Sequence, residues 1–376
     1  MIKVVSRNCQ SYEIKKLKEH FIEIFFESNS LKKIKSLESV LLKPNLLGPY
    51  SPQKGVTTHP IFVSALIEIL KDFNIKISLM DNPGGVNKYE KVLEKCGYTN
   101  LKKKYGIKIF NLTETGIYKI GKNPKYVVSK PFLDCQAIIN LPKLKTHTFT
   151  LMTCAIKNFY GIIPGLAKAN YHRLFPNPTK FAEVILNTYS LVKEKIVFNL
   201  MDGIIGMDGS GPSSGNPKNF GVILGSKDAI ALDICAANLL GFNFKKIPII
   251  YLSAKKYDLS YQEIKMLGDF QKKDVLENVN IQKCIISNRI LRIFSTPLKN
   301  FIKIFFKIYP VFSPKKCTQC GNCIKFCPTS ALTFSKNSTI PKLDRSKCIL
   351  CLCCIEICPQ SASSLKKSLL SKIFLN

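Results

Sequence analysis

The sequence predicts an α/β protein in which a parallel or mixed sheet with flanking helices is followed by a small, cysteine-rich α+β domain. Two observations predict this arrangement. Short apolar segments alternate with helical patterns over residues 1–285, and nine of the 15 cysteines lie between Cys317 and Cys358. With 376 residues, of which 46% are hydrophobic, the chain is long enough for two domains with buried cores.

The elements of the larger domain are expected in chain order. Residues 39–47 form an apolar run that Pro44 stops, and residues 59–73 are predicted to form a helix with apolar positions at Ile61, Ala65, Ile69 and Phe73. A buried strand over 76–80 should end in a polar turn that contains glycine. Later segments are expected to be short strands that end in loops (136–147, 195–215 and 220–227) and one helix (228–242).

This alternation favours a buried sheet, because helices that connect neighbouring strands cover both of its faces. In such sheets the loops after the carboxyl ends of the strands form the ligand crevice. Polar residues in those loops are therefore the first candidates for a site.

The charge of the chain points to anions rather than to nucleic acid. The formal net charge is +31, from 56 Lys and Arg against 25 Asp and Glu. Only five of the 56 are Arg, whereas proteins that bind nucleic acid favour Arg for bidentate contacts. Nucleic acid is therefore not an expected partner. The charge predicts only a general attraction to anions.

The N-terminal segment carries charge where a secretory signal has an apolar core, so the expected location is cytoplasmic, with reduced or metal-bound thiols. Residues 286–313 are predicted to form a basic amphipathic linker helix, and residues 363–376 a basic amphipathic tail. Either segment could lie peripherally on an anionic membrane surface. The favoured alternative for the linker is that it packs on the larger domain and carries the cysteine-rich domain.

The cysteine-rich domain, expected over 314–362, contains one internal repeat. Both copies read C-x2-C-x2-C-x3-C-P, the spacing of bacterial two-cluster ferredoxins, in which the fourth cysteine of each copy binds the other cluster. Two [4Fe-4S] clusters are therefore predicted. Their expected ligands are Cys317, Cys320, Cys323 and Cys358 for the first cluster, and Cys348, Cys351, Cys354 and Cys327 for the second.

Structural zinc is a poor match, because it usually takes pairs of C-x2-C separated by a longer loop. The ninth cysteine of the region, Cys353, is either a buried bystander, which is favoured, or a competitor of Cys354. From residue 286 onward, 15 basic residues face two acidic ones, so an acidic electron carrier (a ferredoxin or flavodoxin) or a redox enzyme is an expected partner.

The larger domain resembles the family known as domain of unknown function 362, which is often fused to a two-cluster ferredoxin domain. Matching motifs occur in the expected order: KPN from Lys43, TTHP from Thr57, DNPGG from Asp81, INLPKLKTH ending at His147, AIKNFYGIIPG from Ala155, MDGIIGMDGSGPSSG from Met201 and DAIALD ending at Asp233. The resemblance implies an iron-sulphur protein with an α/β domain. It implies no reaction.

These motifs contain an unusual number of cationic and amide side chains at or just after apolar strands, which predicts a cationic pocket. The candidate catalytic residues are His147, His172 and Lys145. The candidate substrate-binding residues are Lys43, Asn45, Lys143, Lys157, Asn158, Gly209 and Gly211, with Lys168 close by. The glycines are candidates because their backbone N–H groups could form an anion-binding nest together with Gly203, Gly206 and Gly215.

Structural roles compete with several of these assignments. His147 and His172 could serve as acid and base or as structural hydrogen-bonding groups, and His59 is expected to begin a helix. Asp202 and Asp208 could hold a metal with a histidine, but turns beside glycine are favoured. The scattered cysteines are expected to be buried thiols.

Three functions remain open. The first is a redox enzyme in which the clusters pass electrons to an anionic substrate or cofactor in the crevice. The second is an electron-transfer protein without its own catalysis, which links an acidic carrier to a partner enzyme. The third is a protein that associates with a membrane surface or with nucleic acid and uses its clusters structurally.

Overall fold

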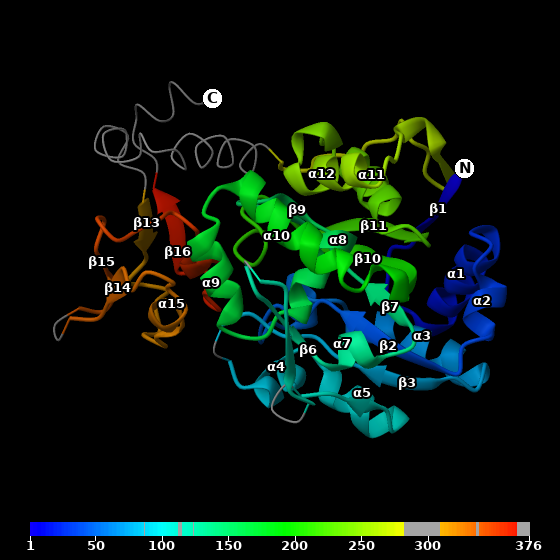
Figure 1. Ribbon diagram of the computed structural model, residues 1–376, viewed down its shortest axis with the longest axis horizontal. Coiled ribbons are helices and arrows are strands. Elements are labelled where there is room, and N and C mark those ends of the chain that lie inside the picture. Colours follow the sequence, from blue (N-terminus) through cyan, green and yellow to red (C-terminus); the bar gives the residue numbers. More distant parts are fainter. Residues whose placement is uncertain (86, 112–114, 123, 282–308, 336–337, 367–376) are drawn as a thin grey trace.

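The computed structural model describes residues 1–85, 87–111, 115–122, 124–281, 309–335 and 338–366. Ten strands form one sheet with the order β12-β1-β11-β10-β7-β2-β3-β4, and β8 and β9 continue it beside β10 (Figure 1). The strands are β1 (Ile2–Asn8), β2 (Ser39–Pro44), β3 (Lys76–Leu79), β4 (Lys108–Ile109), β7 (Ile138–Leu141), β8 (Lys143–His147), β9 (Leu151–Thr153), β10 (Ile196–Asp208), β11 (Asn216–Ser226) and β12 (Ile264–Gly268).

The sheet is mixed, which confirms the predicted fold class. β10, β7, β2, β3 and β4 run parallel to their neighbours in that series, whereas β11 is antiparallel to both β10 and β1. The antiparallel part begins where the chain turns from β10 directly into β11. The parallel half therefore gathers the carboxyl ends of β2, β3 and β7 at one edge of the sheet.

Both faces of the sheet are buried, because successive side chains of a strand point to opposite sides. Within β2, Leu41 belongs to one apolar core, and Val40 and Leu42 belong to the other. The Leu41 side is covered by α8 (Ala155–Asn158), α10 (Pro178–Ser190), α11 (Ala229–Leu239) and α12 (Pro248–Lys256). The other side is covered by α1 (Ile14–Glu27), α3 (Pro60–Asp72), α4 (Tyr89–Lys95) and α5 (Tyr98–Tyr105).

Two expected helices begin at clear caps. His59 accepts the backbone N–H of Ile61 at the start of α3, and Pro60 takes the first helical position, where its missing N–H costs nothing. Asp228 accepts two N–H groups at the start of α11. The buried face of α3 is wider than the predicted stripe, because the helix packs between the sheet and α1.

The segment 195–215 differs from the prediction of a short strand that ends in a glycine-rich loop. Thirteen residues, Ile196–Asp208, form one strand. Gly203 and Gly206 lie inside it, and a Cβ on Gly203 would lie 2.7 Å from the carbonyl oxygen of Val222 on β11. These two glycines therefore allow close strand pairing and do not belong to a loop nest.

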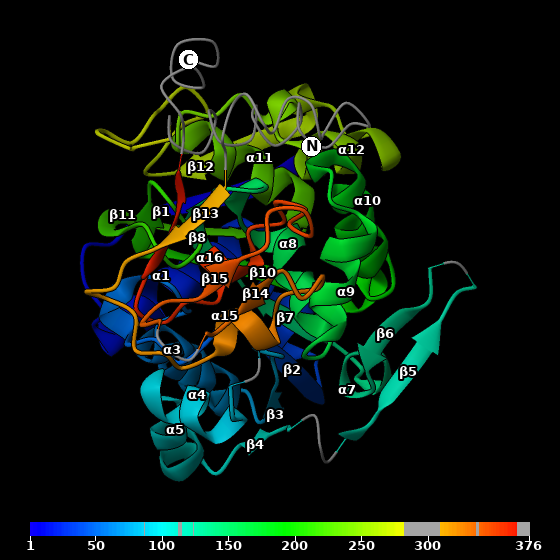
Figure 2. The same ribbon diagram turned by 90° about the vertical axis from the view of Figure 1, so that its left-hand side faces the viewer.

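The smaller elements of the large domain lie at its periphery. They are α2 (Leu31–Lys35), α7 (Pro131–Asp134), α9 (Ala167–Leu174) and the hairpin of β5 (Ile117–Ile120) and β6 (Tyr126–Ser129). The hairpin projects from the body of the domain in Figure 2.

The cysteine-rich domain is small and lies against one end of the large sheet (Figure 2). It contains β13 (Tyr309–Phe312), α15 (Asn322–Lys325), β14 (Leu332–Thr333), β15 (Lys342–Leu343), α16 (Cys353–Glu356) and β16 (Ser363–Lys366). Because β13 pairs with β16, the domain extends beyond the expected bounds of 314–362 on both sides. The rest of the predicted linker, 286–308, and of the tail, 367–376, lies outside the described residues.

Candidate functional site

A cavity lies between the carboxyl ends of the parallel strands and the cysteine-rich domain. It encloses about 720 Å³, including the part that opens to solvent. From the large domain it is lined by Asn45, Lys145, His147, Lys157, Asn158, Lys168 and His172 among others, and from the cysteine-rich domain by Phe326, Glu356 and Ile357. Seven of the predicted polar residues therefore surround one space.

Strand β8 places two of these residues by its alternation. Lys145 and His147 are two residues apart, so their side chains leave the same face of the sheet. Both are almost fully buried. The sequence pattern predicts these residues at or just after an apolar strand; β7 ends at Leu141, and the separate strand β8 begins after Pro142 and carries them.

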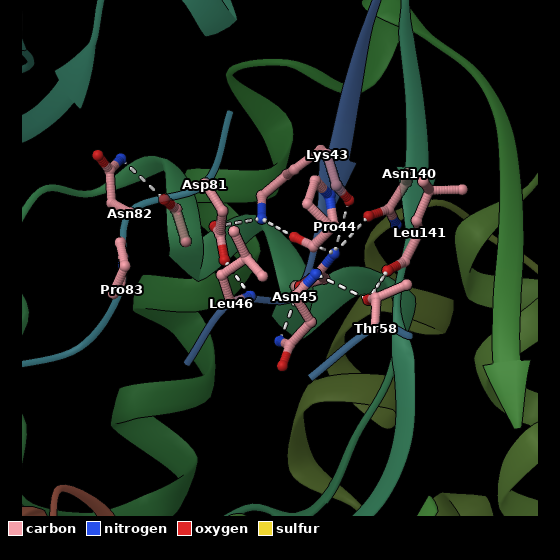
Figure 3. Close-up of polar contacts among 12 residues, drawn as sticks. Lys43, Pro44, Asn45, Leu46, Thr58, Asp81, Asn82, Pro83, Asn140 and Leu141 are labelled. Atoms are coloured by element: carbon pink, nitrogen blue, oxygen red, sulfur yellow. Dashed lines mark hydrogen bonds and ion pairs between the residues drawn. The ribbon is translucent and has the colours of Figure 1, made fainter. Parts of the chain in front are cut away.

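Lys145 is held by oxygen atoms without a full negative charge. Its Nζ donates to Oδ1 of Asn45 at 2.9 Å and to the carbonyl oxygen of Val56 at 2.7 Å. Asn45 in turn donates to Asn158, which donates to Asn140, at 2.9 and 2.8 Å (Figure 3 shows Asn45 and Asn140). Burial, and next the charge of Lys157, lower the pKa of Lys145 well below its ordinary value.

Lys43 and Lys143 do not line the cavity, although both were predicted to bind substrate. Lys43 Nζ lies 2.7 Å from Asp81 Oδ1 (Figure 3), and Lys143 Nζ lies 2.6 Å from Asp202 Oδ2. All four side chains are buried. Each lysine is thus neutralised by a carboxylate, and its role is to hold strands and loops together.

Asp202 therefore has neither of the roles expected for it. It lies inside β10, and besides Lys143 it accepts the hydroxyl of Tyr12 at 2.8 Å and the backbone N–H of His59 at 2.9 Å. Asp208 ends β10 and accepts the backbone N–H of Asn280 at 3.2 Å. Within the described ranges, no set of three His, Cys, Asp or Glu side chains could hold a single metal ion.

Lys157 and Lys168 supply the remaining positive charge of the cavity. Lys157 is half-buried, and in the described part of the chain it makes no hydrogen bond or ion pair. Lys168 is buried and donates to the carbonyl oxygens of Asn82 and Pro83. Burial lowers the pKa of both lysines, that of Lys168 to about 8.

Helix α8, which carries Lys157 and Asn158, is fixed by a buried carboxylate. Asp233 of α11 accepts the backbone N–H groups of Ala155 and Ile156 at 2.6 and 3.0 Å. Burial raises the pKa of Asp233 to about 7. Asp233 thus acts as a positioning residue for two residues of the cavity wall.

The tautomer of His147 is fixed by backbone groups. Its Nδ1 accepts the N–H groups of Phe149 and Thr150 at 3.0 and 3.2 Å, so the proton of the neutral ring is on Nε2. Nε2 lies 3.4 Å from Oε1 of Glu356 in the cavity. Burial, with Lys157 and Lys145 nearby, lowers the pKa of His147 well below its ordinary value.

His172 is stacked on Phe181, with ring centroids 4.1 Å apart. Its Nδ1 is buried without a hydrogen-bond partner among the described residues. Burial lowers the pKa of His172 to about 3, so the ring is neutral at physiological pH. His172 therefore places an uncharged ring, which can accept or donate a hydrogen bond, in the cavity wall.

Gly209 and Gly211 do not line the cavity either. The N–H of Gly209 donates to the carbonyl oxygen of Asn280, and the carbonyl oxygen of Gly211 accepts from Thr148. A Cβ on Gly211 would lie 2.0 Å from the carbonyl oxygen of Thr146, so glycine is needed for this loop to approach β8. Only Pro212 of the loop reaches the cavity.

The same loop instead contacts the cysteine-rich domain. Ser213 donates to the carbonyl oxygen of Glu356 at 2.8 Å, and Ser214 to that of Ile355 at 3.4 Å. Elsewhere Asn322 donates to Asn87 at 3.2 Å. These contacts place α16 and the residue Ile357 that follows it over the cavity.

The nine cysteines of the small domain surround two further spaces. One is lined by Cys317, Cys320, Cys323 and Cys358, and the other by Cys327, Cys348, Cys351, Cys353 and Cys354. The eight predicted ligands thus separate into the two predicted sets. Four thiolates around one space are the ligand set of a [4Fe-4S] cluster.

Cys353 is buried beside the second set and lines the same space. Burial raises the pKa of its thiol well above the ordinary value. Of the cysteines upstream, Cys9, Cys96, Cys154 and Cys235 are buried as expected and Cys135 is half-buried, while Cys284 is outside the described residues.

Sequence reasoning missed Glu356, the carboxylate that faces His147. Glu356 is one of only two acidic residues after residue 285, and it lies between two cysteines of the repeat. A single acid among apolar residues and cysteines was the available signal. Its side chain is 16% exposed, and burial raises its pKa.

Comparisons with known proteins agree with this division of the chain. The family described as domain of unknown function (DUF362) matches residues 40–238, and the 4Fe-4S dicluster domain matches residues 309–359. The thylakoid-associated protein sll1697 of Synechocystis sp. is 31% identical over 218 residues, which cover 57% of this chain and 67% of that protein.

Two solved structures resemble the fold distantly. The lactate racemase apoprotein of Thermoanaerobacterium thermosaccharolyticum has 13% identity and a TM-score of 0.41, over 64% of this chain and 57% of its own. A Thermotoga maritima protein has 12% identity and a TM-score of 0.35, over 65% and 59%. The chain thus spans less than two thirds of each.

No helix in the described part of the chain combines the length and the apolar character needed to cross a membrane. More than half of the chain lies within the DUF362 match, and the match ends before the cysteine-rich domain begins. The protein belongs to the DUF362 family and carries a C-terminal 4Fe-4S dicluster domain.

Proposed function

We propose that the protein is a redox enzyme in which two [4Fe-4S] clusters exchange electrons with a small anionic molecule bound in the cavity. One observation carries this proposal. The cavity is lined on one side by lysines and on the other by Phe326, Glu356 and Ile357, which are next to or within two residues of the cysteines of both sets. A molecule held there would lie between the cations and the clusters.

The charge of the cavity supports an anionic substrate. Lys145, Lys157 and Lys168 line it, whereas its carboxylates are Asp81, which is paired with Lys43, and Glu356. Burial penalises the charged form of these lysines, and a bound anion would restore it. A carboxylate or phosphate group is the expected recognition element.

His147 is proposed to donate a hydrogen bond to the bound molecule. Its Nδ1 is occupied by two backbone N–H groups, so the proton on Nε2 is the one that faces the cavity. The clusters supply one electron each when bound. A neutral imidazole does not release its last ring proton, so Nε2–H would stabilise the developing negative charge through a hydrogen bond. The proton that balances each electron would come from solvent through the open side of the cavity.

The test uses anaerobically prepared protein whose clusters have been reduced with dithionite, which is then removed. Binding of acetate, benzoate and phosphate is measured by calorimetry. In a second assay, small-anion fractions of a cell extract are tested as oxidants of the reduced clusters. In Lys157→Met, binding should weaken about tenfold and reoxidation should slow. Both should be kept in the control Lys103→Met, which removes an exposed lysine of α5. Equal behaviour of both variants would contradict the proposal and favour an electron-transfer protein without its own catalysis.

We also propose a peripheral membrane location, which the name of the thylakoid-associated relative supports. The predicted basic segments 286–308 and 367–376 would supply the contact. Cosedimentation with anionic vesicles should fall when residues 367–376 are deleted. Unchanged cosedimentation would argue against a contact through this tail.

A further inference from the structure

The two sets of cysteines differ in their exposure to solvent. In the first set Cys320 is exposed, Cys317 and Cys358 are half-buried and Cys323 is buried. In the second set Cys327 and Cys348 are half-buried, and Cys351 and Cys354 are buried. The space of the first set is also lined by exposed Thr318 and by Phe334, which is 38% exposed. The first set therefore contains the one exposed cysteine of the eight, and this cysteine would connect its cluster to the surface.

Exposed lysines surround this opening. Lys315 and Lys316 lie in the turn that leads into Cys317, where the N–H groups of Lys316 and Cys317 both donate to Ser313. Lys54 of the large domain lies over the ring of Tyr50, 5.9 Å from its centroid, and the hydroxyl of Tyr50 is 3.5 Å from the carbonyl oxygen of Cys358.

Acidic residues are scarce on the same domain. Residues 309–366 contain only two, Asp344 and Glu356. Asp344 lies 3.6 Å from Lys347, and Glu356 is in the wall of the cavity. The positive potential around the opening is therefore not offset by neighbouring carboxylates.

We propose that an acidic one-electron carrier protein docks on this opening, which we call the entry face. The entry face consists of Cys320, Thr318 and Phe334, with Lys54, Lys315 and Lys316 nearby. An exposed aromatic residue at the first cluster, with exposed lysines nearby, suits an acidic protein with a small apolar contact at its cofactor. One electron leaves the carrier and one enters the first cluster, and no covalent bond or proton changes. Cys320 is exposed, whereas Phe326, Glu356 and Ile357 beside the cysteines line the cavity, so electrons would enter at Cys320 and leave toward the substrate. Only this last step rests on the proposed function.

The probe is flavodoxin, an acidic carrier whose reduced form gives up one electron at a time. Lys315→Glu/Lys316→Glu reverses two charges of the entry face. Lys32→Glu/Lys33→Glu is the matched control, because these lysines are exposed on α2, at the opposite end of the molecule (Figure 1). Reduction of the clusters is followed by stopped flow at low salt, without any small anion substrate, and the affinity of oxidised flavodoxin is measured by calorimetry.

The entry-face variant should bind flavodoxin at least about tenfold more weakly than the control, and flavodoxin should reduce its clusters at least about tenfold more slowly. Both differences should shrink as salt is added. Both variants should be reduced equally fast by dithionite, which shows that their clusters are intact. Equal rates and affinities for the two variants would overturn the proposal. The proposal would also be overturned if the entry-face variant lost only its binding to anionic vesicles, because these lysines would then be assigned to a membrane contact. Neither result depends on whether the cavity binds an anion.

Discussion

Replacing Lys143 and Lys157 by methionine, one at a time, should separate stability from anion binding. Lys143 is fully buried 2.6 Å from Asp202, so its removal leaves a buried carboxylate without its cation. Breaking a buried pair in this way costs about 3–5 kcal/mol of unfolding free energy. Lys157 has no partner among the described residues, so its removal should change the unfolding free energy by no more than about 1 kcal/mol.

The assay is thermal unfolding of the anaerobic protein at one scan rate, followed by anion calorimetry well below the midpoint. At about 2 °C per kcal/mol for a large domain, Lys143→Met should lower the midpoint by about 6–10 °C, and Lys157→Met by no more than about 2 °C. Anion affinity should be unchanged in folded Lys143→Met. It should fall about tenfold in Lys157→Met, the size of one charge-assisted hydrogen bond.

The opposite pattern would refute the assignment. If Lys143→Met kept its midpoint within about 2 °C of the native protein and lost anion affinity, Lys143 would be a ligand and not a structural cation. Lys103→Met controls for the loss of one positive charge from the surface, and it should change neither quantity.

Further predictions follow from single contacts. Gly161→Ala should lower the midpoint sharply, since a Cβ would lie 2.2 Å from Oδ1 of Asp81. Because burial lowers the pKa of Lys168 to about 8, its charge is present below that pH and lost above it, so anion affinity should fall as pH rises through about 8. Lys168→Met should flatten this dependence, and an equally steep pH profile in the variant would refute it. Cys358→Ala should remove one cluster signal from the electron paramagnetic resonance spectrum and Cys353→Ala neither, with iron per chain as the check.

Much of the fold could be predicted because its signals are local. Apolar runs and caps such as His59 act over a few residues, and the cysteine spacing is a property of two short loops. The sequence pattern over 195–215 was misleading, since Gly203 and Gly206 are typical of loops. Here Gly203 allows β10 to approach β11 closely, and Gly206 allows it to approach β8. Whether such a glycine lies in a loop or inside a strand depends on the strand that faces it.

The roles of the lysines could not be predicted, because they depend on what lies opposite in space. Lys43 pairs with a carboxylate 38 residues away in sequence and Lys143 with one 59 residues away. Lys157 makes no direct ion pair among the described residues, although the charge of Glu356 acts on it. In the sequence all three follow or interrupt apolar runs in the same way. The part of the cavity wall formed by Glu356 was equally inaccessible, since it depends on how the second domain packs on the first.

The cavity has walls from both domains, so the proposed function predicts that anion binding is coupled to the redox state of the clusters. Each electron taken up adds one negative charge close to Glu356 and Ile357, across the cavity from Lys145 and Lys157. A bound anion is repelled by that charge, so the oxidised protein should bind an anion such as benzoate more tightly than the reduced protein. By linkage, benzoate must lower the reduction potential of the clusters by the same free energy. Calorimetry in both redox states and a potentiometric titration with and without benzoate measure the two sides of this cycle. A potential that does not move, in a protein that binds benzoate, would mean that the anion lies too far from the clusters to receive their electrons.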